Sequence, residues 1–197
     1  MSTPHRRLSD PRELSALAHP VRMAIIEQLT LSGPLTATEL ADRLDETPAN
    51  CSWHLRKLAQ HGFVEEAEGG KGRQRPWRVP SIGFTWDDHD GTASVDERRA
   101  AEALSEVMLG RALDRLRESE RRTPEQPEEW RRATHTGSQT VAWLTADELR
   151  QMNDEIKAVL ERHMDRLTDP EQRPPGARLC EFVAWGVPVS FPGVDPA

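Results

Sequence analysis

Residues 48–60 carry amide, guanidinium and ammonium side chains at a spacing that places them on one side of a helix. These groups read base edges in a DNA groove, because an asparagine can hold adenine through two hydrogen bonds and an arginine can bind guanine or a phosphate. Alanine or tryptophan can contact the methyl group of thymine. The face expected to meet bases contains Ala49, Trp53, Arg56, Lys57 and Gln60, with Asn50 at its edge.

Phosphate contacts are expected from short hydroxyl groups and from a basic turn. Thr47 and Ser52 are donors of a size that suits phosphates. The glycine-rich turn 69–75 holds three basic residues and no acidic one, so it can follow a DNA backbone or enter a minor groove. We predict base-edge contacts from Asn50, Trp53 and Arg56, and phosphate or minor-groove contacts from Thr47, Ser52, Lys57, Lys71, Arg73 and Arg75.

Two short helices must position this face. The sequence predicts them over 37–44 and 48–61, joined by three residues, which is the length expected of a helix-turn-helix whose second helix enters the major groove. The apolar side of the second helix should pack on the first helix. The residues expected at that contact are Cys51, Leu55, Leu58, Leu40 and Leu44.

The flanking segments complete a mainly α-helical fold with a small β wing. Short strands from Val64 and over 76–79 should enclose the basic turn as that wing. Residues 1–9 are expected to be a loose tail, and helices are expected at about 11–18 and from Pro20 to Gly33. The predicted organisation is a winged helix-turn-helix domain over 1–80, a linker over 81–93, and a mainly helical region for dimerisation, and for an effector if one binds, over 94–197.

A long helix predicted from Ser94 to about residue 122 has two apolar seams. One seam contains Ala100, Leu104, Val107 and Met108, and the other contains Leu109, Leu113 and Leu116. Two seams imply two packing partners, one of which can be a second subunit. The predicted dimerisation residues are Leu104, Val107, Met108, Leu109, Leu113 and Leu116.

The remaining third of the chain gives weaker signals. A short helix is expected around Trp130, a weak strand over 139–144, and a helix from Thr145 to about residue 167. Residues 179–189 are apolar enough to predict a buried or paired strand.

Residues 8–80 resemble the ArsR-like winged-helix transcription regulators, in the actinobacterial branch with a long C-terminal extension. The resemblance is carried by the stretches LSALAHPVRMAIIEQL, LTATELADRL, TPANCSWHLRKLAQHGFVEE and GGKGRQRPWRV. It implies a homodimer that binds an operator, usually as a repressor released by a signal. It also implies that residues 49–57 form the recognition helix, that 69–75 form the wing, and that His54 is a packing histidine. Asp45 stands where the family often has glycine, and a left-handed aspartate is tolerated there.

Composition restricts the compartment and the partners. The net charge of −7 disfavours a protein that binds polyanions regardless of sequence, although residues 69–80 form one basic segment. No stretch is long and apolar enough to span a membrane, and the first residues lack the apolar core of a secretory signal. Two cysteines cannot build a disulfide framework, so we expect a reduced, cytoplasmic protein.

No catalytic, metal or cofactor site is expected. The helix 36–44, where metal-sensing relatives place thiolates, has neither cysteine nor histidine, and residues 95–122 contain no histidine. Cys51 and His54 are three residues apart, but Cys51 falls on the core face. The run 87–90, of sequence DDHD, could hold a hard cation but is expected to be a solvated linker. Phosphate-binding and nucleophile motifs are absent, so we expect no enzymatic activity.

The predicted function is a sequence-specific DNA-binding regulator, a homodimeric repressor whose recognition helices lie about 34 Å apart on a partly palindromic operator. Its expected partners are double-stranded DNA, a second copy and, in one alternative, a small-molecule effector. That alternative is a ligand-gated regulator whose C-terminal region forms a pocket lined by Trp86, Trp130, Trp143 and Trp185. A second alternative is a helix-turn-helix used to bind another protein.

Overall fold

The computed structural model describes residues 6–69, 75–81, 83–86, 93–134 and 139–193. The chain forms two compact units, Met1–Arg122 and Thr123–Ala197. The sequence suggested a division at 81–93 instead. The boundary lies later because the long helix that follows this segment packs into the core of the N-terminal unit.

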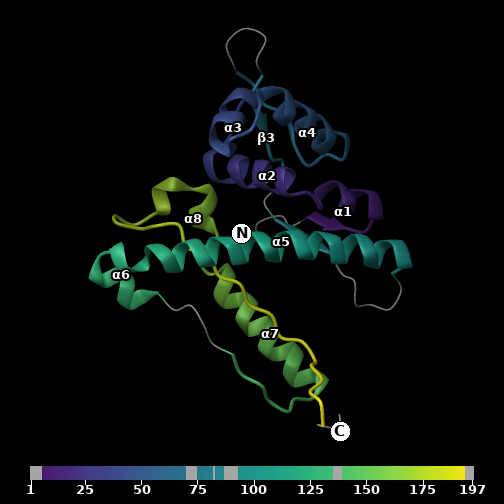
Figure 1. Ribbon diagram of the computed structural model, residues 1–197, viewed down its shortest axis with the longest axis vertical. Coiled ribbons are helices and arrows are strands. Elements are labelled where there is room, and N and C mark those ends of the chain that lie inside the picture. The colour runs from purple at the N-terminus through teal and green to yellow at the C-terminus, as the bar shows by residue number, and fades with distance from the viewer. Residues whose placement is uncertain (1–5, 70–74, 82, 87–92, 135–138, 194–197) are drawn as a thin grey trace. The chain divides into compact units, whose positions relative to one another are not determined.

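The N-terminal unit holds five helices among its described residues, in the order that the sequence predicts (Figure 1). Proline begins three of them, where its missing N–H leaves no unsatisfied donor. Gly33 ends the second helix at a φ of +79°, which the lack of a Cβ permits. The helices are α1 (Pro11–Leu17), α2 (Pro20–Ser32), α3 (Ala37–Leu44), α4 (Pro48–Gln60) and α5 (Val95–Arg122).

Two small sheets accompany these helices. In the wing, β2 (Glu65–Glu66) pairs antiparallel with β3 (Trp77–Arg78), and Trp77 also bridges to Leu35. The second sheet pairs β1 (Arg6–Leu8) in parallel with β4 (Phe84–Trp86). The expectation of a loose tail over 1–9 was therefore wrong for β1, whose Leu8 is buried in the core.

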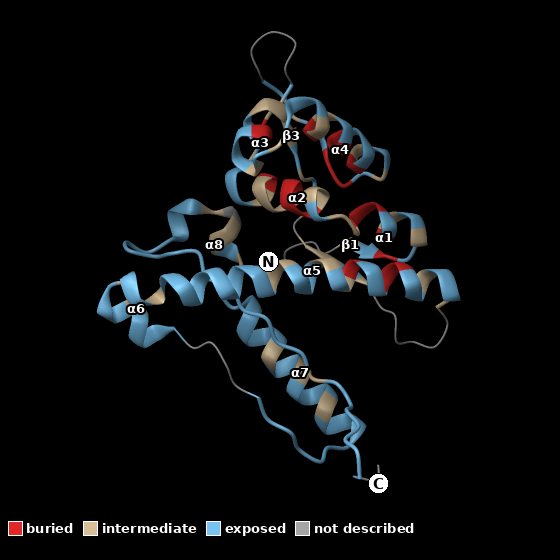
Figure 2. Cartoon of the chain, viewed as in Figure 1, coloured by how far each residue is buried: buried red, intermediate tan, exposed pale blue. Residues whose placement is uncertain are grey.

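The core lies between α1, α2, α3, α4 and the first half of α5 (Figure 2). On α5 the buried residues are Ala100, Ala101 and Leu104, so part of the first predicted seam packs inside the chain. Ser94 caps α5 as expected, with its Oγ accepting from the N–H of Glu97 at 3.2 Å. The observed architecture confirms the predicted fold class, mainly α-helical with a small β wing.

Among the residues of the C-terminal unit that the structure describes, the longest helix is α7 (Ala146–Glu161). A capping box between Thr145 and Glu148 begins α7 as predicted. The helix ends at Glu161 rather than near residue 167. None of the residues whose burial is described in this unit is buried (Figure 2). Its other helical segments are η1 (Thr123–Glu125), α6 (Glu128–Ala133), α8 (Asp165–Thr168) and η2 (Pro170–Gln172).

Two strand predictions in this unit were wrong. Residues 139–144 and 179–189 join no β-ladder with any described residue, and their large apolar side chains are exposed. Alternating apolar residues make a segment suitable for a strand, but a ladder also needs a partner strand. In the described parts of the chain, no helix is long and apolar enough to cross a membrane.

Candidate nucleic-acid interface

A tight turn joins α3 to α4 and fixes the helix-turn-helix. Asp45 adopts the left-handed conformation, with φ 54° and ψ 46°, and caps the end of α3. Thr47 then begins α4, its Oγ1 accepting from the N–H of Asn50 at 3.2 Å. The backbone groups at both ends of this turn are therefore hydrogen-bonded locally. At the other end of α3, the capping box between Thr36 and Glu39 begins the helix as predicted.

The apolar side of α4 packs into the core. Cys51, Leu55 and Leu58 are fully buried, as is Leu40 on α3, which confirms the expected contact between the two helices. Burial, together with the nearby carboxylate of Glu46, raises the pKa of the Cys51 thiol. Cys51 is therefore a small apolar core residue in its protonated form.

The opposite side of α4 faces solvent, as the sequence predicted. Trp53 is 48% exposed, and the Nζ of Lys57 lies 5.9 Å from the centre of its ring. Arg56, which precedes Lys57 in the sequence, is exposed. The ammonium of Lys57 beside the indole of Trp53, together with the exposed guanidinium of Arg56, gives this face both stacking and charged groups. Ala49 and Gln60 are also exposed, and Ser52 is half-buried.

Asn50 is less free than the sequence suggested. It is half-buried, and its Nδ2 donates to the Oε2 of Glu46 at 2.7 Å. A bidentate contact with adenine needs both the amide N–H and the carbonyl oxygen, so this hydrogen bond must open before Asn50 can read adenine in that way. The contact with Glu46 was not predicted, because Glu46 precedes the helix and its position depends on the conformation of the turn.

The wing carries its own acidic residues. Glu66 Oε2 lies 2.9 Å from Arg75 Nη1, and Glu65 Oε1 lies 2.5 Å from Arg78 Nη2. Arg75, a predicted phosphate contact, is thus already paired within the chain. The pair is exposed, so a phosphate can replace the carboxylate at little cost. The other two predicted wing contacts, Lys71 and Arg73, lie outside the described residues.

Two histidines lie behind the exposed face, with their rings in contact and tilted 47° to each other. His54 on α4 is 3% exposed, and its ring centroid is 4.7 Å from that of His19 and 4.7 Å from that of Trp53. No described residue forms a hydrogen bond with His54 Nδ1. Burial, then His19 and Arg22, lower the pKa of His54, while Glu46 opposes the shift. His54 is therefore a buried packing histidine, as the resemblance implied, held in its neutral form.

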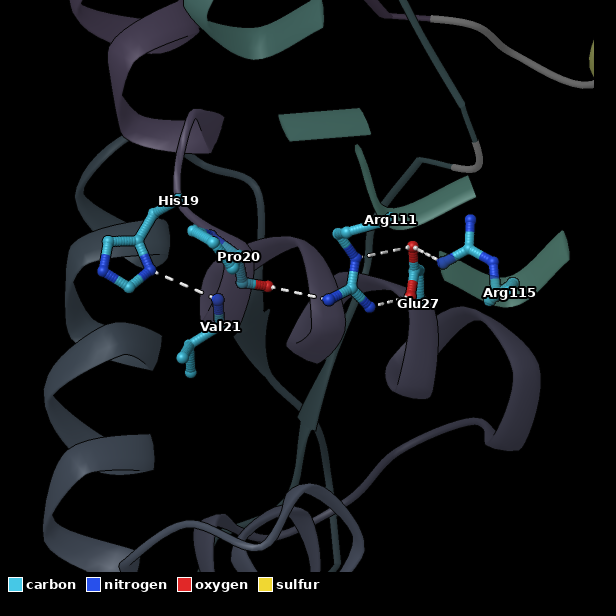
Figure 3. Close-up of polar contacts among 6 residues, drawn as sticks. All are labelled: His19, Pro20, Val21, Glu27, Arg111 and Arg115. Carbon is cyan, nitrogen blue, oxygen red and sulfur yellow. Dashed lines mark hydrogen bonds and ion pairs between the residues drawn. The ribbon is translucent and has the colours of Figure 1, made fainter. Parts of the chain in front are cut away.

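His19 also connects α4 to the start of α2. Its Nδ1 accepts from the N–H of Val21 at 3.2 Å and so caps α2 (Figure 3). Burial, together with the charge of Arg22, lowers its pKa too. The sequence analysis did not select His19, because only the fold brings it next to His54.

A cluster of charges joins α2 to α5 (Figure 3). Glu27 on α2 accepts from Arg111 Nη2 at 2.5 Å and from Arg115 Nη1 at 3.1 Å. The Nη1 of Arg111 also donates to the carbonyl of Pro20 at 3.3 Å. The long helix is thus attached to both the start and the middle of α2.

The predicted dimerisation residues of α5 fall into two groups. Leu104 is fully buried and Val107 packs against the core, so Leu104 faces its own chain and is not available to a partner. The prediction that Leu104 contacts a second subunit is therefore wrong. The residues that remain exposed are Met108, Leu109, Leu113 and Leu116.

The four tryptophans of the alternative pocket are divided between the two units. Trp86 packs against the core of the N-terminal unit, and Arg178 covers Trp130 at 4.7 Å. Trp143 and Trp185 are 73% and 65% exposed. Among the described residues, no three metal-ligating side chains lie together, and the run 87–90 lies outside those residues.

Comparisons with known proteins agree with the observed domain. A family model described as a helix-turn-helix domain matches residues 17–67. No curated protein matches the chain.

Several solved structures are similar in part. Reduced HlyU from Vibrio cholerae is 22% identical, covering 47% of this chain and 81% of its own, with a TM-score of 0.31. A transcriptional regulator homologue from Pyrococcus horikoshii is 24% identical, covering 48% and 86%, with a TM-score of 0.31. A MarR family protein from Mycobacterium tuberculosis, in complex with salicylic acid, is 21% identical, covering 77% and 87%, with a TM-score of 0.30.

The family match spans α2, α3, α4 and β2, the first strand of the wing. Together with β3, these elements define a winged helix-turn-helix domain, and α4 carries basic and aromatic side chains on its exposed face.

Proposed function

We propose that this chain is a homodimeric transcription repressor that recognises a partly palindromic operator. The observation that carries the proposal is the two-sided α4, which is locked into the core by Cys51, Leu55 and Leu58 and presents Trp53 and Arg56 to solvent. A rigid helix with a guanidinium and an indole on its free side suits reading of base edges in a major groove.

Base reading is assigned to Arg56, Trp53 and Asn50, the last after it leaves Glu46. Ala49 supplies a methyl contact beside them. Lys57, Thr47 and Ser52 bind phosphates, and the wing contributes Arg75 together with Lys71 and Arg73. The protein acts without a cofactor and in the cytoplasm.

The second subunit docks on the exposed seam of α5. Leu109, Leu113 and Leu116 lie on the side of α5 away from the buried residues Ala100 and Leu104. Met108 lies on the same side as Leu104, one turn further along α5, and is exposed. A leucine seam left exposed on a long helix favours helix-to-helix association with an identical copy.

The proposal is tested by selecting bound genomic fragments at about 150 mM salt, where binding that ignores sequence is weak. A palindromic motif with half-sites about one helical turn apart is expected. Arg56→Ala should relax the preference at one position of each half-site, at a cost of about 1–3 kcal/mol, whereas Lys57→Ala should weaken all sequences alike and lower the salt slope by about one.

Arg117→Ala is the matched control, because it removes the same charge from an exposed position on α5. It should change neither the motif nor the affinity beyond the general effect of one charge. Equal recovery of all fragments by the wild-type protein would exclude a sequence-specific regulator and favour a protein-binding module.

A further inference from the structure

The segment 183–191 of the C-terminal unit has a strict alternation of large and small side chains. From Val183 to Phe191 the odd positions are all large and apolar, and the even positions are alanine, glycine, proline and serine. We call residues 183–191 the strap, and its five large odd-numbered residues the outer row. The outer row consists of Val183, Trp185, Val187, Val189 and Phe191. A period of two is that of an extended chain with two different faces.

The strap runs beside α7 (Figure 1) and meets this helix at Gly186. The Nδ2 of Asn153 donates to the carbonyl of Gly186 at 3.0 Å. A Cβ at position 186 would lie 2.6 Å from Asn153 Oδ1 and 3.2 Å from Leu149 Cδ1. Glycine therefore permits this close approach, and the contact fixes which side of the strap faces the helix.

The outer row has no partner among the described residues of this unit. Its five side chains are between 50% and 65% exposed, and neighbouring Phe182 is 75% exposed. No β-ladder includes the strap in the described chain. The residues of this unit whose burial is described include apolar rows but no buried side chain, so they do not form the core that a folded unit needs, and this apolar surface requires a cover.

We propose that the outer row docks against the outer row of a second copy of this chain, with the two straps antiparallel about a two-fold axis. The inference rests on the proposed homodimer, which brings a second copy to the same molecule. In a two-fold contact, each copy offers the same surface, so an alternating row can serve as both sides of the interface.

Charge and area both favour an identical partner. Residues 182–193 carry no charged side chain, so two straps can meet without placing like charges together. The outer row exposes roughly 600 Å² in each chain, taking about 250 Å² for a whole large aromatic side chain. Two rows together thus reach roughly 1,200 Å², the lower limit for a stable specific interface. Leu179 and Phe182, both exposed, extend the same segment.

The test compares Val189→Asp with Ser190→Asp in the full chain. The two variants place the same carboxylate one residue apart on opposite sides of the strap. Because Val189 is already 62% exposed, the single chain should tolerate the change, and circular dichroism checks that the helices are retained. Sedimentation equilibrium measures self-association, and binding of the selected DNA is measured on the same samples.

Val189→Asp should weaken self-association at least tenfold, and Ser190→Asp should leave it within about twofold. Equal association of both variants, whether unchanged or equally weakened, overturns the strap interface, as does a wild-type chain that stays monomeric. If association depends on Val189 but the wild type selects no DNA motif, the strap interface stands and the proposed function fails. If Leu113→Asp, and not Val189→Asp, breaks a DNA-binding dimer, the proposed function stands without the strap.

Discussion

Arg111 on α5 forms a half-buried ion pair with Glu27 on α2, at 2.5 Å between Nη2 and Oε2. The same guanidinium reaches the carbonyl of Pro20, and the residue before it, His19, contacts His54 of the proposed recognition helix. The helix proposed for dimerisation is therefore joined to the proposed DNA-reading helix by direct contacts through the start of α2; Figure 3 shows the contact between Arg111 and Pro20. This arrangement links the orientation of α4 to that of α5.

Replacing Glu27 should weaken this connection. Glu27→Gln removes the carboxylate that Arg111 and Arg115 both contact, so the free energy of unfolding should fall by about 1–2 kcal/mol. Urea denaturation measures the loss. Asp114→Asn is the control, because it removes the partner of Arg117 in an exposed pair on the same helix and should cost less than about 0.5 kcal/mol. Equal losses in both variants would show that the contact between α2 and α5 has no special role.

The histidine pair predicts a loss of stability in acid. Burial lowers the pKa of both His19 and His54 in the folded protein below the ordinary value of 6.5. As the pH falls below about 6.5, these histidines bind protons more readily in the unfolded chain than in the folded chain, so protonation favours unfolding. The stabilising contribution is complete above about pH 6.5 and is lost progressively below it. The free energy of unfolding, measured by urea denaturation from pH 7.5 to pH 5, should decline across this range.

The variant His54→Gln identifies the source of this decline. It removes one titrating ring from the cluster and should make the pH dependence shallower, even if it lowers stability at every pH. The control is His163→Gln, which changes an exposed histidine of the C-terminal unit. A pH dependence that is equally steep in His54→Gln and in the wild type would contradict this assignment.

The helices were predictable because their ends are encoded locally. Thr36 with Glu39 and Thr145 with Glu148 each form the capping box that their spacing indicated. The buried side of α4 followed from its apolar period, and it is packed as expected around Leu55. These features depend on residues three or four apart, so the sequence alone contains them.

Features that depend on distant residues were missed. β1 is three residues long and exists because it pairs with β4, far along the chain. The two seams of α5 were visible, but the assignment of Leu104 was wrong because the pattern does not say which seam meets the chain's own core. Arg75 was read as free because its pairing with Glu66 depends on the register of the wing strands. The contact between His19 and His54 likewise exists only in the folded chain.

The left-handed Asp45 predicts different effects for two small substitutions. At φ 54° a glycine meets no steric penalty, whereas alanine keeps the Cβ and loses the polar side chain that makes this conformation tolerable. Asp45→Gly should therefore be more stable than Asp45→Ala by about 1 kcal/mol, as measured by thermal or urea unfolding. If alanine equals glycine here, the turn between α3 and α4 is not held in the left-handed conformation in solution.

The pairing of Glu66 with Arg75 predicts that an acidic residue restrains DNA binding. The Oε2 of Glu66 lies 2.9 Å from the Nη1 of Arg75, so a phosphate must displace this carboxylate before it can bind the guanidinium. Glu66→Gln should release Arg75 and raise the affinity for the selected operator. An exposed pair contributes about 0.2–1 kcal/mol, so the gain attributable to the pairing should be roughly 1.4-fold to fivefold. Fluorescence anisotropy with labelled operator at fixed salt measures it.

Removing any negative charge from the wing also reduces repulsion from DNA, so the matched control is Glu68→Gln. Glu68 lies in the same wing, two residues away, and its substitution changes the net charge by the same amount. The difference between the two variants isolates the released guanidinium from the general change in charge. In the Arg75→Ala background this difference should vanish, because no guanidinium remains to be released. If Glu66→Gln keeps its advantage over Glu68→Gln without Arg75, Glu66 acts on DNA directly, and the ion pair does not regulate the wing.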